Sequence, residues 1–336
     1  MKARLLIYTL LSVVLLHGWS GARAQTYTVT DFGTLGGTKS QANDINNRSQ
    51  VVGNSTLPGD TVSRAFLWQD GVLGDLGSLG GTFTTANAIN NRGEAVGASE
   101  TTGNTARHAV LFRDGETVDL GALPGSQFGT AFGISQRGEI FGGSTITGRG
   151  PFFHAVQYKD GEVVDLGTLG GPSSFAGYAN HHGQSAGRAD IPSGSSRAVI
   201  FGDGTITDLG TLPGGTSSTA RAINNRGQVS GISDTANGEL HAFLLSDGVM
   251  TDLGTLGGKF SDPFGHSINN RGEVVGKSTT ASGQMHAFLF ADGVLRDLND
   301  LIPADSGWVL TAAQAINDHG HIVGFGAING QPMPFF

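Results

Sequence analysis

The sequence predicts an all-β fold, a seven-bladed β-propeller of four-stranded repeats of about 44 residues each. Three observations lead to it: an acidic-apolar pair that recurs at a constant period, two turn signals inside each repeat, and chain ends that complement each other. A fixed period of this length indicates a unit that cannot bury its apolar face alone and must pack on its neighbours. An open β-solenoid remains the structural alternative.

The period is set by an Asp-Leu or Asp-Phe pair in each copy. Successive pairs are 44, 44, 46, 43, 44 and 45 residues apart. They are Asp31-Phe32, Asp75-Leu76, Asp119-Leu120, Asp165-Leu166, Asp208-Leu209, Asp252-Leu253 and Asp297-Leu298. The spacing therefore predicts seven copies of one unit.

Each copy contains four short strand signals. The first strand ends in Ile and is closed by an Asn-Asn-Arg-Gly turn, as at residues 90–93, because Asn and Gly tolerate left-handed backbone. A second strand follows at once, as at residues 51–53. The third is rich in β-forming residues, as at residues 65–68, and an Asp-Gly turn such as Asp70-Gly71 leads into the fourth, which carries the Asp-Leu pair.

The two ends of the chain supply complementary parts of one repeat. Residues 26–32 align with a fourth strand, whereas the C-terminus supplies a first strand, a second strand and a stub of the third at residues 333–336. Pairing these parts would close the seventh blade with the N-terminal strand and remove exposed sheet edges. Pro332 and Pro334 argue against full pairing, since proline is poor in a paired strand.

The first 24 residues have the features of a secretory signal peptide. Lys2 and Arg4 precede an apolar run over residues 5–16, and Ala22-Arg23-Ala24 offers a cleavage site. We expect residues 1–24 to be removed and residues 25–336 to form one propeller domain, secreted to the periplasm or outside the cell. The alternative is an uncleaved membrane anchor.

The charge balance and the lack of cysteine make some classes of binding partner and binding site unfavourable. Removal of residues 1–24 takes away three basic residues and no acidic one, which leaves 17 Lys and Arg against 28 Asp and Glu. This balance disfavours nucleic acid and anionic membranes. The absence of cysteine excludes disulfides and thiolate metal sites. We expect a monomer with no cofactor and no membrane span in the mature chain.

The motif His-Ala-Phe occurs at residues 241–243 and 286–288, together with D-L-G-x-L-G-G and I-N-x-x-G elements. On these residues the chain resembles the secreted HAF-repeat proteins over nearly all of its mature length. The resemblance implies an extracellular location and a repeat architecture, but no biochemical activity. Departures from the motif are Arg64 and Arg197 in place of His, Val110, Val156 and Val199 in place of Phe, and Pro334 at the His position of the last copy.

One histidine in most copies is the most obvious candidate for chemistry. The set consists of His108, His154, His241 and His286. Imidazole can bind metal or move protons, but one side chain per blade points to a different place in each copy. We therefore predict a structural role for these histidines and for Arg64 and Arg197 at the same position, with no metal site.

Variable loops are expected on one face of the ring and the tight turns on the other. The most irregular features of the loop face are an insert containing Arg149, Phe152 and Phe153, and Trp308 beyond a long connection. Arginine and aromatic side chains suit sugars or protein partners, so these four residues are the predicted binding site. The alternative is that the aromatic side chains pack between blades.

Two functions remain open. The first is a secreted, non-enzymatic binding or scaffold module that holds a polysaccharide or protein on the loop face. The second is a secreted glycan hydrolase or lyase with its centre at the mouth of the ring channel, which would need two convergent carboxylates there. No G-x-S-x-G, H-E-x-x-H, P-loop or dinucleotide motif is present. We assign no catalytic residue and favour binding.

Overall fold

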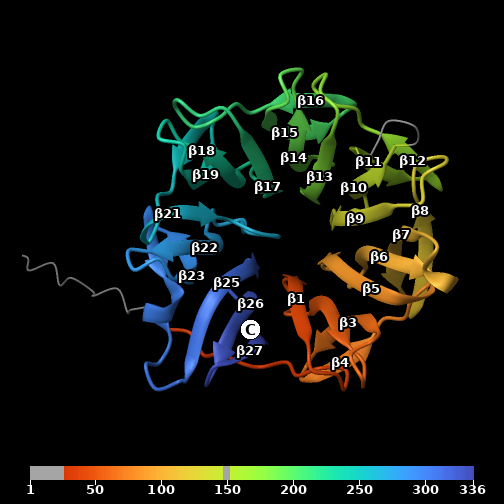
Figure 1. Cartoon of the computed structure of the whole chain (residues 1–336), viewed down its shortest axis with the longest axis horizontal. Helices are drawn as coiled ribbons and strands as arrows, with labels where there is room; N and C mark the ends of the chain where they lie inside the picture. Colours follow the sequence, from red (N-terminus) through yellow and green to blue (C-terminus); the bar gives the residue numbers. More distant parts are fainter. Residues whose placement is uncertain (1–25, 147–151) are drawn as a thin grey trace, which may run out of the picture.

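The computed structural model describes residues 26–146 and 152–336, and the predicted signal peptide lies outside them. The described residues form strands and two short 3-10 helices, η1 (Thr102–Asn104) and η2 (Leu298–Leu301). Among them, no helix is long and apolar enough to cross a membrane. The strands are arranged around a common centre (Figure 1).

The strands pair into antiparallel groups that follow the sequence repeat, and we call these groups units 1 to 7. Unit 1 consists of β1 (Ser40–Ile45), β2 (Val51–Thr56), β3 (Ser63–Gln69) and β4 (Val72–Asp75). Unit 2 consists of β5 (Gly80–Ile89), β6 (Ala95–Thr101), β7 (Arg107–Arg113) and β8 (Glu116–Gly121). Unit 3 consists of β9 (Gly129–Ile134), β10 (Ile140–Thr145), β11 (Phe153–Lys159) and β12 (Glu162–Asp165). Units 4 and 5 are β13 (Ser174–Ala179), β14 (Ser185–Asp190), β15 (Ser196–Gly202) and β16 (Thr205–Asp208); β17 (Ser218–Ile223), β18 (Val229–Asp234), β19 (Leu240–Ser246) and β20 (Val249–Asp252). Units 6 and 7 are β21 (Gly257–Asp262), β22 (Val274–Thr280), β23 (Met285–Ala291) and β24 (Val294–Asp297); β25 (Trp308–Ile316), β26 (Ile322–Ile328) and β27 (Gln331–Phe335).

The Asp-Gly turns join the third and fourth strands as predicted. Asp70 and Gly71 both have positive φ, 53° and 83°, between the paired residues Gln69 and Val72. Two successive left-handed residues give the turn whose twist matches a hairpin. The local sequence therefore fixes this connection.

A glycine in each second strand allows the first strand to bulge over it. A β-carbon at Gly53 would overlap the carbonyl oxygen of Gln41 and meet the ring of Phe66. The β1–β2 register shifts at this point, between Ala42 and Asp44. The second-strand glycine is therefore required by close approach of the neighbouring backbone and the phenylalanine below it.

The hydrophobic core consists of clusters that each span two neighbouring units. Val52 of unit 1 packs with Ala86 and Val110 of unit 2. The ends of the chain follow the same rule, since Val323 of unit 7 lies in one cluster with Phe66 of unit 1. Each sheet thus buries its faces against the next sheet, which explains why one unit alone has no complete core.

Unit 6 departs from the repeat in its first strand. β21 ends at Asp262, and only an isolated bridge between Ile268 and Val274 continues the pairing. Pro263 follows directly and has no backbone N–H to donate. The chain then turns through Gly265, which has a φ of 65°. This irregular segment carries Phe264 and His266 toward the centre of the ring.

Residues 26–35 contact both the last unit and the first. They have no strand assignment, but Thr30 and Phe336 exchange two backbone hydrogen bonds of 2.9 and 3.0 Å. The ring of Phe32 lies 5.4 Å from that of Trp68 and 6.3 Å from that of Phe336. The N-terminal segment therefore contacts units 1 and 7 together.

The prolines near the C-terminus do not prevent pairing. β27 pairs with β26, with Pro334 opposite Phe325. Phe336 directs its N–H and C=O to Thr30, and residues two positions apart in a strand direct these backbone groups to the same side. The nitrogen of Pro334 therefore points away from β26, where its missing donor costs no ladder bond.

Candidate functional site

A central pocket of about 650 Å³ lies among the first strands of the units. Its lining residues, such as Gln41 and Asn87, precede the Asn-Asn turns that end these strands. The pocket is therefore on the side of the ring where the variable loops enter. The structure thus provides a hollow in the centre of the loop face, where the sequence analysis placed only the centre of the alternative, hydrolytic function.

Four phenylalanines form the apolar part of the central pocket: Phe83, Phe132, Phe175 and Phe264. The rings of Phe132 and Phe175, from neighbouring units, have centroids 4.3 Å apart. Phe264 is 39% exposed. Aromatic rings open to solvent in a concave site are typical of surfaces that bind ligands.

Two arginines give the pocket its positive charge. Arg221 donates from Nε and Nη2 to the two carboxylate oxygens of Asp262, at 3.2 and 3.0 Å. Burial raises the pKa of Asp262, and the charges of Arg221 and Lys277 oppose this rise. Arg188 is exposed and, within the described residues, has no hydrogen-bond or ion-pair partner. Arg188 is therefore the guanidinium available to a ligand.

Side-chain amides complete the rim. They belong to Gln41, Asn43, Asn54, Asn87 and Gln314. Asn43 Nδ2 donates to the carbonyl of Ala86 in the next unit at 2.8 Å, and Asn87 Nδ2 donates in the same way to Ala131 at 2.8 Å. These bonds fix the amides in place, so the rim presents pre-ordered polar groups.

Tyr178 forms the floor of the central pocket. Its hydroxyl donates to the carbonyl of Asn87 at 2.9 Å, although Tyr178 belongs to unit 4 and Asn87 to unit 2. Its ring stacks on His266, with centroids 5.1 Å apart and an interplanar angle of 13°. Burial, reinforced by the charge of Asp44, raises the pKa of Tyr178 well above its usual value. The tyrosine therefore stays neutral and closes the pocket from below.

His266 and Asp44 lie on the other side of this floor. His266 Nδ1 is 3.2 Å from Asp44 Oδ1. Burial lowers the pKa of His266, but the charge and hydrogen bond of Asp44 and the charge of Asp318 outweigh it, so the pKa is raised. The His266 side chain keeps 30% of its surface accessible despite its central position, because it faces a small chamber.

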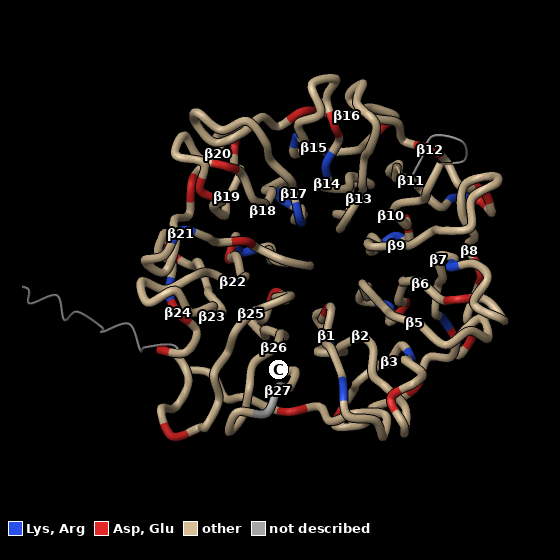
Figure 2. The backbone as a smooth tube through the Cα atoms, viewed as in Figure 1, with Lys and Arg blue, Asp and Glu red and all other residues tan. Residues whose placement is uncertain are grey.

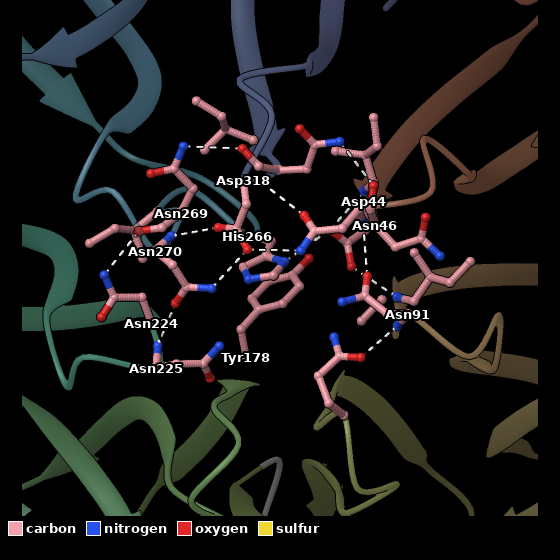
Figure 3. A pocket seen from close by; sticks show the side chains of 18 of the residues that line it. Asp44, Asn46, Asn91, Tyr178, Asn224, Asn225, His266, Asn269, Asn270 and Asp318 are labelled. Atoms are coloured by element: carbon pink, nitrogen blue, oxygen red, sulfur yellow. Dashed lines mark hydrogen bonds and ion pairs between the residues drawn. The ribbon is translucent and has the colours of Figure 1, made fainter.

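This inner chamber, of about 80 Å³, is lined by the turns that end the first strands (Figure 3). The first Asn of each turn links neighbouring units: Asn224 Nδ2 donates to the carbonyl of Asn269 at 2.9 Å, Asn269 to that of Asn317 at 3.1 Å, and Asn317 to that of Asn46 at 2.9 Å. The Asn-Asn turns are thus contacts between units as well as hairpin turns, which sequence reasoning missed.

The acidic residues of this region lie outside the central pocket. Among the described residues that line the central pocket there is no Asp or Glu, whereas glycoside hydrolysis uses a pair of carboxylates. The nearest buried acids, Asp44 and Asp262, are hydrogen-bonded to His266 and Arg221. Within the described part of the chain, no group of three or more His, Cys, Asp or Glu side chains is placed to hold a metal ion.

The binding residues predicted from sequence lie elsewhere. Phe152 and Phe153 are 36% and 44% exposed at the start of β11, and Arg149 is outside the described residues. Trp308 begins β25 and packs edge-on against Phe335, with centroids 6.4 Å apart. None of the three described residues lines the central pocket, so their role in binding stays a prediction.

The repeat histidines pair with the Asp of the Asp-Leu motif in the same unit. The distance from the histidine Nδ1 to the aspartate carboxylate is 2.9 Å for His108 and Asp119, 2.7 Å for His154 and Asp165, 2.8 Å for His241 and Asp252, and 2.5 Å for His286 and Asp297. Arg197 is 3.9 Å from Asp208, and Arg64 donates to the carbonyl of Gly81 at 3.1 Å. These contacts join the third strand to its neighbours, and the structural role remains a prediction.

Sequence reasoning missed the pocket phenylalanines because they do not repeat in register. The following turn begins 7 residues after Phe83, 3 after Phe132 and 5 after both Phe175 and Phe264, so only the last two share a register. A search aligned on the repeat treats them as scattered substitutions. The available signal was their common segment, since each falls between a fourth strand and the next turn, in a ring whose first strands face the centre.

No protein-family model matches the sequence, and none of the curated proteins is similar to it in sequence. Solved structures are similar in fold. A puromycin-hydrolyzing peptidase of Mycobacterium tuberculosis gives a TM-score of 0.57 at 12% identity, covering 90% of this chain and 53% of that chain. The β-propeller domain of the Trilobed protease from Pyrococcus furiosus gives 0.50 at 12% identity, covering 76% and 82%.

The fold is a β-propeller. This confirms the all-β propeller class predicted from the repeat. A prolyl endopeptidase is also similar, with a TM-score of 0.52 at 9% identity over 85% of this chain and 48% of that one. The chain thus spans about half the length of the two peptidases. At these identities the similarity concerns the fold alone.

Proposed function

We propose that this chain is a secreted, seven-bladed β-propeller of the HAF-repeat type that binds a polysaccharide or protein partner in its central pocket, without catalysing a reaction. The blade count is supported by the seven units, and closure by core clusters that also join unit 7 to unit 1. The backbone bonds between Thr30 and Phe336 support the N-terminal segment as the outer strand of the last blade. Secretion is supported by the signal peptide features of residues 1–24.

The observation that carries the binding function is the lining of the central pocket. Four phenylalanines from units 2, 3, 4 and 6 are gathered there with Arg188 of unit 4, which has no partner among the described residues, and with the hydrogen-bonded amides of Asn43 and Asn87. The described lining contains no carboxylate. Burying these groups under a ligand removes apolar surface from water and gives Arg188 a partner. Rigid aromatic and arginine side chains are the residues that supply most binding energy at interfaces.

The experiment uses residues 25–336 on an array of neutral polysaccharides, acidic polysaccharides and unstructured peptides. Replacing Phe132 and Phe175 together with Ala should weaken binding of the retained ligand by about tenfold or more, as expected for the loss of central aromatic anchors. The matched control replaces Phe152 and Phe153, which are exposed outside the pocket, with Ala. Loss of binding in the control alone, or no ligand on any array, would overturn the proposal.

A further inference from the structure

A second hollow continues the central pocket outward across units 6, 7 and 1. It has a volume of about 880 Å³ and shares Gln41, Phe264 and Gln314 with the central pocket. It adds the side chains of Lys39, Lys277 and Phe325. We call the two hollows together the basic groove. Because its lining comes from all seven units, the basic groove suits a chain-like ligand better than a single small molecule.

The charge of the basic groove is opposite to that of the protein. The chain carries 20 Lys and Arg against 28 Asp and Glu, yet the described lining of the groove contains Lys39, Arg188, Arg221 and Lys277 and no acidic residue. In Figure 2 basic positions on β14 and β17 lie toward the centre, while many acidic positions follow the outer rim. A concave surface of one sign concentrates ligands of the other sign.

Three of the four cations are available. Arg221 is paired with Asp262. Lys39, Arg188 and Lys277 have no ion pair with another described residue. The Lys277 ammonium lies 5.3 Å from the ring centre of Phe264, and the Arg221 guanidinium lies 5.3 Å from the same ring. Phe264 therefore presents an apolar surface between two positive charges.

The remaining groups of the groove favour a sugar chain as the anionic ligand. Sugar rings have apolar faces of C–H groups that pack on aromatic rings such as Phe132, Phe175 and Phe264. Their hydroxyls need both donors and acceptors, and a side-chain amide offers both. A surface of rings, amides and separated cations thus matches a polymer in which hydroxyl-rich rings alternate with carboxylates.

We propose that the basic groove holds an acidic polysaccharide whose carboxylates pair with Arg188 and Lys277, an inference that rests on the binding function proposed above and names its ligand class. Carboxylate pairing with an arginine is a charge-assisted contact with defined geometry. Lys277 acts as a second, less directional positive charge.

The test compares polygalacturonate with its methyl-esterified form, which has the same backbone without the charges, and with poly-glutamate as an acidic peptide. Binding to residues 25–336 is measured by calorimetric titration at two salt concentrations. Polygalacturonate should bind at least about tenfold more tightly than the ester and weaken at higher salt, because exposed charges are screened. Arg188→Gln with Lys277→Gln should abolish this preference.

Lys259→Gln is the matched control, because Lys259 is 86% exposed and pairs with Glu239 away from the groove. If both polygalacturonates bind equally well and binding is lost only when Phe132 and Phe175 are replaced, the proposal of an acidic ligand is wrong. The proposed binding function would still hold. Tighter binding of poly-glutamate would overturn the acidic polysaccharide in favour of a peptide. Absence of binding to all three polymers would overturn the acidic polysaccharide, whereas the binding function itself is decided by the array experiment described above.

Discussion

His266 occupies the channel because one repeat is irregular. The Asp262-Pro263 step ends β21 early, and the chain then passes through Gly265, where a β-carbon would overlap the carbonyl oxygen of Gln314. No other unit brings a histidine to this place beside Asp44 in the described structure. The sequence shows the proline and the histidine but not their consequence, because the repeat alignment predicts a regular first strand here.

The contact between His266 and Asp44 predicts a pH dependence of stability. The pKa of His266 is raised in the folded protein, so the contact stabilises fully below the unfolded pKa of about 6.5 and is lost as the pH rises through the folded value. The free energy of unfolding should therefore fall with rising pH in this range. His266→Gln should make that fall shallower, as measured by denaturant unfolding at a series of pH values.

The groups facing His266 are Asp44, Asp318 and the ring of Tyr178. The control is His182→Gln, which replaces a histidine that is exposed on a turn. Parallel curves for the wild type and His266→Gln would contradict the prediction.

Strands were predictable element by element because their signals are local. Asp-Gly between apolar runs determines the hairpin at Asp70 and Gly71, and the second-strand glycine marks the close approach of the first strand. The N-terminal segment was less predictable. Thr30 of this segment bonds to Phe336, but local sequence cannot show how many backbone bonds a long-range pair will form, and the role of the segment as a fourth strand stays a prediction.

The N-terminal segment is expected to stabilise the whole ring. Deleting residues 25–32 removes Phe32, which is 8% exposed between units 1 and 7, and this loss alone should lower the free energy of unfolding by about 3 to 5 kcal/mol. Thr30→Pro should cost about 1 to 3 kcal/mol, because the carbonyl of Phe336 loses its donor. Both are measured by denaturant unfolding.

Thr30→Ala is the control, since it keeps both backbone bonds to Phe336. A deletion variant that unfolds at the same denaturant concentration as the full mature chain would show that the segment does not close the ring.

At the scale of the whole molecule, the turns around the inner chamber form a nearly continuous ring of hydrogen bonds. The backbone N–H at the second turn position donates to the side chain of the next unit: Asn225 to Asn270 at 2.9 Å, Asn270 to Asp318 at 2.8 Å, and Asp318 to Asn47 at 2.9 Å. Each unit thus holds its neighbour at the centre, in addition to the core between the sheets. Such nearest-neighbour terms determine the stability of repeat proteins.

The ring is interrupted between units 3 and 4. Ser135 stands where other units have an asparagine, and its hydroxyl bonds within its own turn. His181 stands where Asn, Gln or Asp accepts in other units, and among the described residues no hydrogen bond joins Gln136 to His181. The sequence shows both exchanges, but only the three-dimensional arrangement of the turns shows that both affect the contact between units 3 and 4.

Restoring the repeat residues should therefore strengthen this join. In Ser135→Asn with His181→Asn, the new amide at 135 can donate to the carbonyl of Asn180, and the new side-chain oxygen at 181 can accept from the N–H of Gln136. Each restored bond should add about 1 kcal/mol to the free energy of unfolding, measured by denaturant unfolding.

The reverse exchange, Asn225→His, supplies the matched control one join further along the ring. It removes the oxygen that accepts from the N–H of His181 at 2.9 Å and should lower stability by a similar amount. One outcome is that Asn225→His destabilises the protein while the double variant unfolds like the wild type. In that case the missing hydrogen bonds between units 3 and 4 do not lower the free energy of unfolding, and the prediction is wrong. If the double variant is more stable, hydrogen exchange at the inner turns should slow most at residues 135, 136 and 181, because an open join exposes these amides first.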